Sequence, residues 1–189
     1  MCLEQGNDGW TVIQRRVSDA VAFHHMGWED YKDGFGDYRY NYWIGLEKLH
    51  HMTSSDSYEL FVGLHDQYAH VYRHAVYESF AVASEDQNYM LTVGDWDSSR
   101  STLVDSLSSH SGTAFTTHDR DNDDHQSINC AHQGDLYYGG WWFRGNDCLD
   151  ANLNGQYITQ ASTNQANGIL WQGINEYSKA ATIMAIRRI

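Results

Sequence analysis

The sequence has no proline, few basic residues and no long hydrophobic segment. Without proline, its turns must be made by the 16 glycines and by Asn, Asp and Ser. Only 12 basic residues stand against 25 acidic ones, giving a formal net charge of -13, which argues against binding to nucleic acid or to an anionic membrane. No apolar run is long enough to cross a bilayer, so we expect no membrane insertion. The start, MCLEQGNDGW, has no hydrophobic signal-peptide core, so a secreted protein would be present here in a mature or trimmed form.

Cysteine is also scarce. Cys2, Cys130 and Cys148 allow one disulfide and leave one cysteine over. The absence of Cys-x-x-Cys, together with the scatter of the 11 histidines, argues against a zinc site. No Asn-x-Ser/Thr motif is present, so N-glycosylation is not expected.

What is present fits a folded domain. The 189 residues are 41% hydrophobic and 14% aromatic, enough for one domain with a substantial core. Alternating or β-branched segments predict strands at 9–17, 58–66, 70–83, 88–97 and 182–189. Helical patterns cover 28–38, 42–54 and, more weakly, 101–107. Residues 108–179 show no regular period, and loops of that length usually carry function. The last strand is expected to return to the first sheet.

The most unusual segment is FTTHDRDNDDHQSINC, residues 115–130, which holds Asp119, Asp121, Asp123 and Asp124. Clustered carboxylates repel one another, so the segment is either a solvated acidic turn or a site for a hard cation such as calcium. An EF-hand does not fit, because Gln126 stands at its glycine position and His132 at its glutamate position. No nucleophile motif or Ser–His–Asp arrangement stands out, so a hydrolase is disfavoured.

Several motifs occur together in a familiar order. They are DGWTVIQRR, WEDYKDGFGD, YWIGLEKLH, NYMLTVGDW, FTTHDRDND, GGWWF and NLNGQY. In order and rough spacing the chain resembles the fibrinogen C-terminal globular domain, which is shared by fibrinogen chains, ficolins, tachylectins and angiopoietins. Family members normally begin earlier, with a cysteine that pairs with the one at the position of Cys2.

The resemblance implies an α+β fold with a central twisted antiparallel sheet flanked by short helices. It divides this single domain into a sheet-and-helix part at about 1–108, a loop-rich part at about 109–180, and the returning strand at 181–189. It also implies an extracellular, non-enzymatic recognition domain whose loop-rich part holds a calcium ion, a disulfide and a ligand pocket.

Residue by residue, the resemblance assigns the calcium ligands to the side chains of Asp121 and Asp123 and to the main-chain carbonyls of His125 and Ser127. His125 would contribute its carbonyl and not its ring. The loop before Cys130 is one residue longer than is usual in the family, which leaves a one-residue shift of the carbonyl ligands open. The resemblance also pairs Cys130 with Cys148 in a disulfide.

The same comparison outlines a ligand pocket for an acetyl group. Trp141 and Trp142 match core residues beneath its floor. The matched pocket positions are Tyr137, Asp147, Cys148, Leu149, Gln165, Ala166 and Tyr177. The Asp147–Cys148 bond is expected to be cis, as often in the family, turning a backbone N–H toward the ligand. Leu149 replaces the usual His and Gln165 the usual Tyr, while Ala166 in place of Asp argues against binding a free amino group.

These implications predict a secreted, calcium-binding lectin for acetylated carbohydrate, acting in innate immunity or agglutination. Two alternatives remain open: a receptor-binding domain of the angiopoietin type, and an adhesion or matrix module without a small-ligand pocket. Oligomers of the parent protein would form through upstream segments that this sequence lacks.

Overall fold

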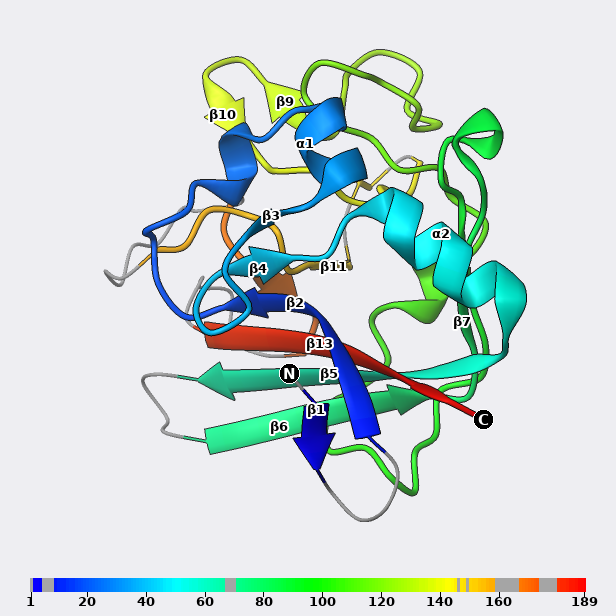
Figure 1. The fold of residues 1–189 in the computed structure, drawn as a ribbon. Helices are drawn as coiled ribbons and strands as arrows, with labels where there is room; N and C mark the ends of the chain where they lie inside the picture. The colour runs from blue at the N-terminus through cyan, green and yellow to red at the C-terminus, as the bar shows by residue number, and fades with distance from the viewer. Residues whose placement is uncertain are drawn as a thin grey trace.

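An antiparallel sheet of seven strands forms the centre of the fold (Figure 1). The computed structural model describes residues 2–4, 9–66, 71–145, 147–148, 150–158, 167–173 and 180–189. The strand order is β3-β4-β2-β13-β5-β6, and β1 pairs with β2 outside this path. The bounds are β1 Cys2–Glu4, β2 Gly9–Arg16, β3 Phe35–Gly36, β4 Tyr42–Trp43, β5 Tyr58–Asp66, β6 Val71–Tyr77 and β13 Ala180–Arg188.

The C-terminal strand lies in the middle of this sheet. In Figure 1, β13 runs between β2 and β5, and it pairs antiparallel with both. Its register with β5 is continuous from Ala180 opposite Asp66 to Arg188 opposite Tyr58. The prediction that the last strand returns to the first sheet is therefore confirmed, and the sheet is complete only when both ends of the chain have joined it.

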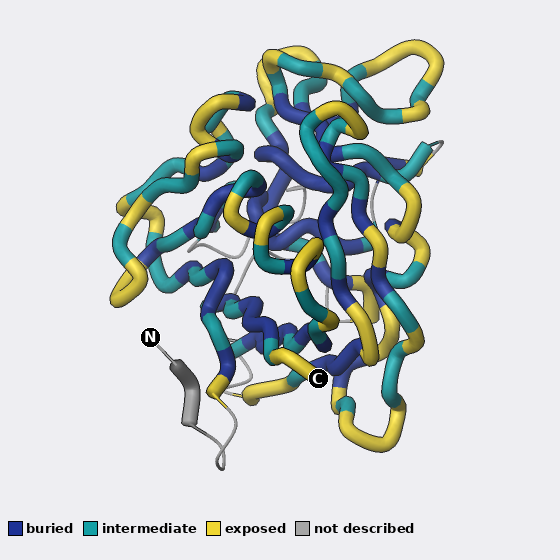
Figure 2. The backbone as a smooth tube through the Cα atoms, turned by 45° about the vertical axis from the view of Figure 1, so that its right-hand side comes forward, coloured by how far each residue is buried: buried dark blue, intermediate teal, exposed yellow. Residues whose placement is uncertain are grey.

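One face of the sheet packs against two helices, α1 Trp28–Asp33 and α2 Leu46–Ser55. Alternate residues of β5 and β13 point into this core, among them Leu60, Val62, Met184 and Ile186, which are all fully buried. In Figure 2 buried segments run through the middle of the molecule and exposed segments lie at the loop ends. The α+β architecture is as predicted.

The outer edge of β6 is covered by residues 97–103. Asp97 and Thr102 donate their backbone N–H groups to the carbonyls of Val76 and His74, and the Ser101 hydroxyl accepts from the N–H of Val76. This covering protects a sheet edge that would otherwise expose unpaired backbone groups. The helix predicted at 101–107 is wrong, because residues 101–103 bond to β6 and the rest of the segment is irregular loop.

Several predicted helix and strand boundaries are wrong, because glycines and other residues with positive φ interrupt the predicted elements. The helix predicted at 42–54 begins only at Leu46, because Gly45 has φ +107° and residues 42–43 form β4. The helix predicted at 28–38 ends at Asp33, before Gly34 at φ +89°. The strand predicted at 88–97 shrinks to β8, Leu91–Val93, because Asn88 adopts a left-handed conformation with φ 50°.

The run at 70–83 is also divided, into β6 and a separate strand β7, Phe80–Val82. β7 pairs with β8 in a small second sheet. The described residues also form three 3-10 helices: η1 Phe23–His25, η2 Glu85–Gln87 and η3 Ser108–His110.

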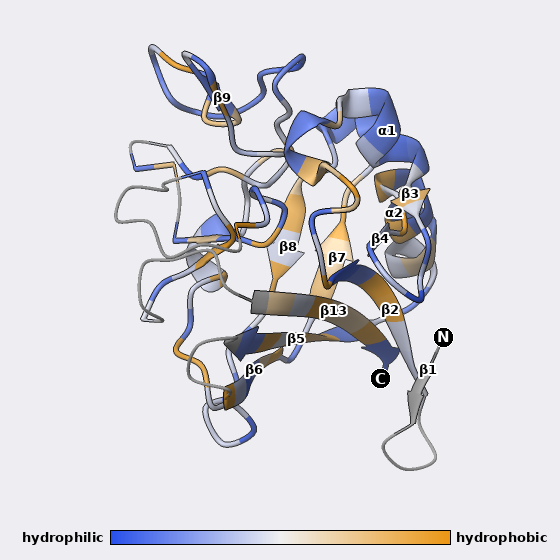
Figure 3. Cartoon of the chain, turned by 90° about the vertical axis from the view of Figure 1, so that its left-hand side faces the viewer, coloured by the Kyte–Doolittle hydropathy of each residue, from blue (hydrophilic) through white to orange (hydrophobic). Residues whose placement is uncertain are grey.

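Between residue 110 and β13 the described chain is mostly loop, as predicted. Its regular pairs are short: β9 His132–Gln133 with β10 Leu136–Tyr137, and β11 Ala151–Asn152 with β12 Leu170–Trp171. In Figure 3 the β9 segment lies at the opposite end of the molecule from β6.

Candidate functional site

The acidic segment begins with a tight turn that is fixed to α1. Thr117 and Arg120 exchange backbone hydrogen bonds of 2.9 and 3.2 Å across this turn. Asp119, between them, accepts the N–H of Trp28 at 3.0 Å at the start of α1 and the hydroxyl of Thr117 at 2.7 Å. Asp119 therefore has a structural partner and is not free to bind a cation with the other carboxylates.

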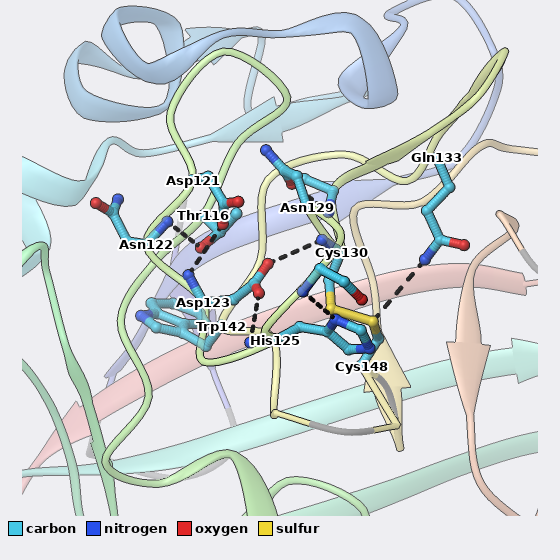
Figure 4. The surroundings of a disulfide bond; sticks show 12 residues. Thr116, Asp121, Asn122, Asp123, His125, Asn129, Cys130, Gln133, Trp142 and Cys148 are labelled. Carbon is cyan, nitrogen blue, oxygen red and sulfur yellow. Dashed lines mark hydrogen bonds between the residues drawn. A yellow bond between two sulfur atoms is a disulfide. The ribbon is translucent and has the colours of Figure 1, made fainter.

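Asp121 and Asp123 lie on the next part of the loop. One carboxylate oxygen of Asp123 accepts the N–H of His125 at 2.9 Å, and the other accepts the N–H of Cys130 at 2.8 Å (Figure 4). Asp121 accepts the N–H of Asp123 at 3.3 Å. Burial raises the pKa of Asp123, and the negative charge of Asp121 raises it further, although the two backbone N–H groups oppose the shift.

The candidate ligand atoms, two carboxylates and two carbonyl oxygens, fit calcium. Across the described residues, no Lys, Arg or His forms an ion pair with Asp121 or Asp123. The carbonyls of His125 and Ser127 accept no hydrogen bond from any described residue, so both oxygens are available. The His125 ring is turned back onto the loop, where its Nδ1 accepts the N–H of Ser127 at 3.3 Å.

The described part of the chain holds no group of three His, Cys, Asp or Glu side chains arranged for a metal ion. The set predicted here has two carboxylates and two carbonyls, which is oxygen-only chemistry of the kind that calcium prefers. The calcium ligands remain a prediction.

The Cys130–Cys148 disulfide is confirmed, with the two Cα atoms 5.6 Å apart. It joins the end of the acidic loop to the segment after Trp142. Figure 4 shows it beside Asp123, whose carboxylate accepts the Cys130 N–H. The bond thus anchors the far end of the loop that carries the candidate calcium ligands.

The predicted cis bond between Asp147 and Cys148 is wrong. Within the described residues every peptide bond is trans. Cys148 instead adopts φ +56°, and its N–H closes a tight turn by donating to the carbonyl of Gly145 at 3.1 Å. Because this turn already uses the N–H, Cys148 cannot be the ligand donor that was predicted.

Tyr137 lies among three histidine rings. His132 stacks on it with ring centroids 4.4 Å apart, and the rings of His25 and His118 lie 4.7 and 5.4 Å away. We call Tyr137 and these three histidines the Tyr137 cluster. His118 Nε2 lies 3.2 Å from the carbonyl of His25, so the cluster joins η1, the acidic segment and the β9–β10 hairpin. Sequence analysis missed the histidines, because they are far apart in the chain and share no motif.

The remaining predicted site residues have different outcomes. Asp147 is exposed and lies 3.5 Å from Arg144. Leu149, Gln165, Ala166 and Tyr177 fall outside the described residues. Trp141 and Trp142 are fully buried, as predicted for core residues.

A buried polar group escaped the sequence analysis, which considered the scattered histidines only as evidence against a zinc site. His110 is fully buried, with Nδ1 2.6 Å from the carbonyl of Trp142. Its Nε2 accepts the N–H groups of Asp150 and Ala151, both at 3.2 Å. His110 therefore ties η3 to the segments on both sides of the disulfide.

Comparison with known proteins decides the family. Residues 1–188 match the family model described as the C-terminal globular domain of fibrinogen beta and gamma chains. The chain belongs to this family. Among curated proteins, the fibrinogen C domain-containing protein 1 of Macaca fascicularis is 42% identical over 188 residues, which cover 96% of this chain and 41% of the relative. The human protein of that name is 41% identical, with 96% and 38% covered.

Solved fibrinogen-like structures agree. The globe of human ANGPTL2 has a TM-score of 0.86 at 35% identity, covering 99% of this chain and 84% of that one. Lamprey fibrin D-dimer, complexed with the peptide ligand Gly-His-Arg-Pro-amide, has a TM-score of 0.82 at 28% identity, covering 99% and 63%. The chain spans about two fifths of the length of its curated fibrinogen-like relatives. Of the helices described in this fibrinogen-like domain, none has the length and apolar character to cross a membrane.

Proposed function

We propose that this fibrinogen-like domain is an extracellular recognition module that binds calcium through Asp121 and Asp123 and holds an acetyl-bearing glycan at the Tyr137 cluster. The observation that carries this proposal is the uncompensated pair of carboxylates. A loop that keeps two acids without a cationic partner close together is destabilised by their repulsion, and a cation that binds only the folded state offsets that cost. The disulfide supports an oxidising, extracellular environment.

The calcium loop and the Tyr137 cluster are close along the chain and joined by hydrogen bonds. Asp123 accepts from Cys130, His132 donates its N–H to Asn129, and Tyr138 donates its N–H to Ala131. Calcium at Asp121 and Asp123 would therefore stabilise the backbone that positions His132 and Tyr137.

The Tyr137 cluster offers the two features that an acetyl group needs. The Tyr137 ring is half-buried and supplies an apolar wall for the methyl. The ring nitrogens of His25 and His132 make no hydrogen bond with any described residue, so either can donate to the acetyl oxygen in place of the Cys148 N–H. One hydrogen bond contributes about 1 kcal/mol, so a single site should bind on the order of millimolar. Several copies would be needed for useful affinity.

A protein ligand is the second candidate, as in a receptor-binding or adhesion module. The turn between β3 and β4 exposes Tyr38 at 48% and Tyr40 at 61%, on either side of Arg39. Tyr and Arg are enriched at the centres of protein interfaces. The fold is also shared with lamprey fibrin D-dimer, which was solved with a peptide ligand.

Two measurements test the proposal. Calcium should raise the melting temperature of metal-stripped protein, and Asp121→Asn should abolish that rise; a calcium-independent melting curve would contradict the calcium site. NMR titration with N-acetylglucosamine, glucosamine and acetate, in calcium, should then shift signals of Tyr137 and His132 for the two acetyl-bearing compounds.

Tyr137→Ala should remove these shifts, whereas the matched Tyr40→Ala should not. Equal shifts with glucosamine would contradict acetyl recognition. An absence of shifts with all three compounds, in protein that binds calcium, would favour the protein-ligand alternative.

A further inference from the structure

Arg120 directly precedes the candidate calcium ligands, yet its charge is directed away from them. Its guanidinium lies 3.9 Å from the ring centroid of Trp28. One of its terminal nitrogens is 3.3 Å from a carboxylate oxygen of Glu85, and the other donates to the side chain of Asn88 at 3.0 Å. The nearest basic residue in the sequence is thus engaged by α1 and by η2.

Glu85 is at the centre of this arrangement. It accepts the indole N–H of Trp28 at 2.9 Å and the ammonium of Lys32 at 2.6 Å, in addition to its ion pair with Arg120. The hydrogen bonds from Lys32 and Trp28 lower the pKa of Glu85, so its carboxylate is charged over the physiological range. Because it holds Trp28 and Arg120 together, it fixes the surface on which the guanidinium stacks.

The turn at 117–120 also keeps the charge of Arg120 apart from the charges of Asp121 and Asp123. Asp119 binds the start of α1 and Arg120 stacks on Trp28, so the first two charged residues of the segment face the helix. Asp121 and Asp123 follow the loop toward Cys130 instead. Among the described residues Glu85 is the carboxylate with which Arg120 pairs, so without Glu85 the positive charge next to the acidic loop would no longer be neutralised.

We propose that Glu85 is a positioning residue for the acidic loop, holding Arg120 against Trp28 so that the negative charge of Asp121 and Asp123 remains available to a calcium ion. This inference rests on the proposed function, because it concerns the strength of calcium binding at the same loop. It adds a residue that lies outside the loop and touches none of the candidate ligands.

The test is calorimetric titration of metal-stripped protein with calcium chloride at low ionic strength. Glu85→Gln should weaken calcium binding roughly three- to tenfold, because an unneutralised positive charge is left beside the loop. Arg120→Gln should strengthen binding, and the double variant should return to near the affinity of the unmodified protein. Glu29→Gln is the matched control, since it removes the same charge from an exposed residue of α1 that does not contact Arg120.

If Glu85→Gln weakens calcium binding while Arg120→Gln strengthens it, the cause is the position of the charge and not damage to the loop. Damage to the loop would weaken binding in both Glu85→Gln and Arg120→Gln, which would overturn the inference. The loss in Glu85→Gln should also shrink as NaCl rises from about 20 mM to about 0.3 M, because salt screens the charge. If Glu85→Gln does not fold, Arg120→Gln decides: tighter binding supports the inference, and unchanged or weaker binding overturns it.

The two proposals fail in different ways. An unmodified protein that binds no calcium would overturn the calcium site itself. Calcium binding that is equal in Glu85→Gln and Glu29→Gln would overturn only the role of Glu85.

Discussion

The sheet and the loop-rich part of this domain both bury large side chains, but their backbone groups find hydrogen-bond partners in different ways. In the sheet, β13 pairs residue by residue with β5. In the loop-rich part, buried amide side chains replace the ladder. Asn152 donates to the carbonyl of Tyr138 at 2.7 Å, and Asn154 donates to that of Gly140 at 2.9 Å.

This difference determines which substitutions destabilise each part most. A strand shares its hydrogen bonds among many residues, so one substitution removes little of the ladder. A loop segment depends on single polar side chains, and each buried partner left unsatisfied costs about 1–3 kcal/mol. The two parts meet at Gln14 of β2, whose side chain donates to the carbonyl of Leu153 at 2.9 Å.

The largest expected effect lies at the aromatic junction between the two parts. The Trp142 ring contacts Trp43 and Phe80 on the sheet side and Phe115 on the loop side, and its N–H donates to Tyr89. Trp142→Ala should lower the free energy of unfolding by about 3–5 kcal/mol, measured by denaturant unfolding. Trp142→Phe should cost clearly less, since it keeps most of the apolar volume. Equal costs for the two variants would show that the ring volume is unimportant.

The disulfide comes next. Replacing both Cys130 and Cys148 by Ser should cost about 3 kcal/mol, because the bond closes a loop with a sequence separation of 18. Dithiothreitol should destabilise the unmodified protein by a similar amount and leave the double variant unchanged. If the reductant destabilised both proteins equally, the bond would not be the source of the effect.

A pH effect should follow from His110. Burial lowers the pKa of this ring, and the hydrogen bond to the Trp142 carbonyl opposes the shift only in part. Since the folded pKa lies below the unfolded value of about 6.5, the stabilisation is complete above that pH and is lost as pH falls toward the folded pKa. His110→Gln should cost about 1–3 kcal/mol at pH 8. Its stability should converge with that of the unmodified protein in acid; parallel pH curves would contradict this account.

The smallest effect is expected at Gly112, which is compared with Gly36 because the two have nearly the same backbone angle. Gly112, in the loop-rich part, has φ +87° with no atom within 4 Å of an added Cβ. Gly112→Ala should therefore cost only the left-handed conformation, about 1–2 kcal/mol. Gly36, in the sheet, has φ +84°, and a Cβ there would overlap the carbonyl of Asn41. Thermal melts should show a larger loss for Gly36→Ala; equal losses would show that crowding does not distinguish the two parts.

The same contrast explains what could be predicted from the sequence. The alternation in β2, β5 and β13 is a local pattern, so these strands were predicted closely. The errors at Gly45 and Asn88 arise from residues with positive φ, which interrupt a pattern without changing its hydrophobic period. The 101–107 error has a different cause, because residues 101–103 are held by the distant edge of β6.

For the candidate site, sequence motifs predicted the acidic loop and the disulfide, whereas contacts between residues far apart in the chain could not be predicted. Arg120 and Glu85 are 35 residues apart, and His25 and His118 are 93 residues apart, so no local pattern joins either pair. The turn before Cys148, in which its N–H donates to the carbonyl of Gly145, also has no local sequence signal that predicts it. Contacts of this kind follow from the complete fold.

Hydrogen exchange with and without calcium tests the central claim most directly. The account holds that the loop-rich part is completed by a cation at Asp121 and Asp123, whereas the sheet is stable without it. Calcium should slow exchange of the His125 and Cys130 amides, which donate to Asp123, and leave the central amides of β5 and β13 unchanged. Asp121→Asn should remove this local protection. Identical exchange in both conditions, or protection spread evenly over sheet and loops, would contradict the account.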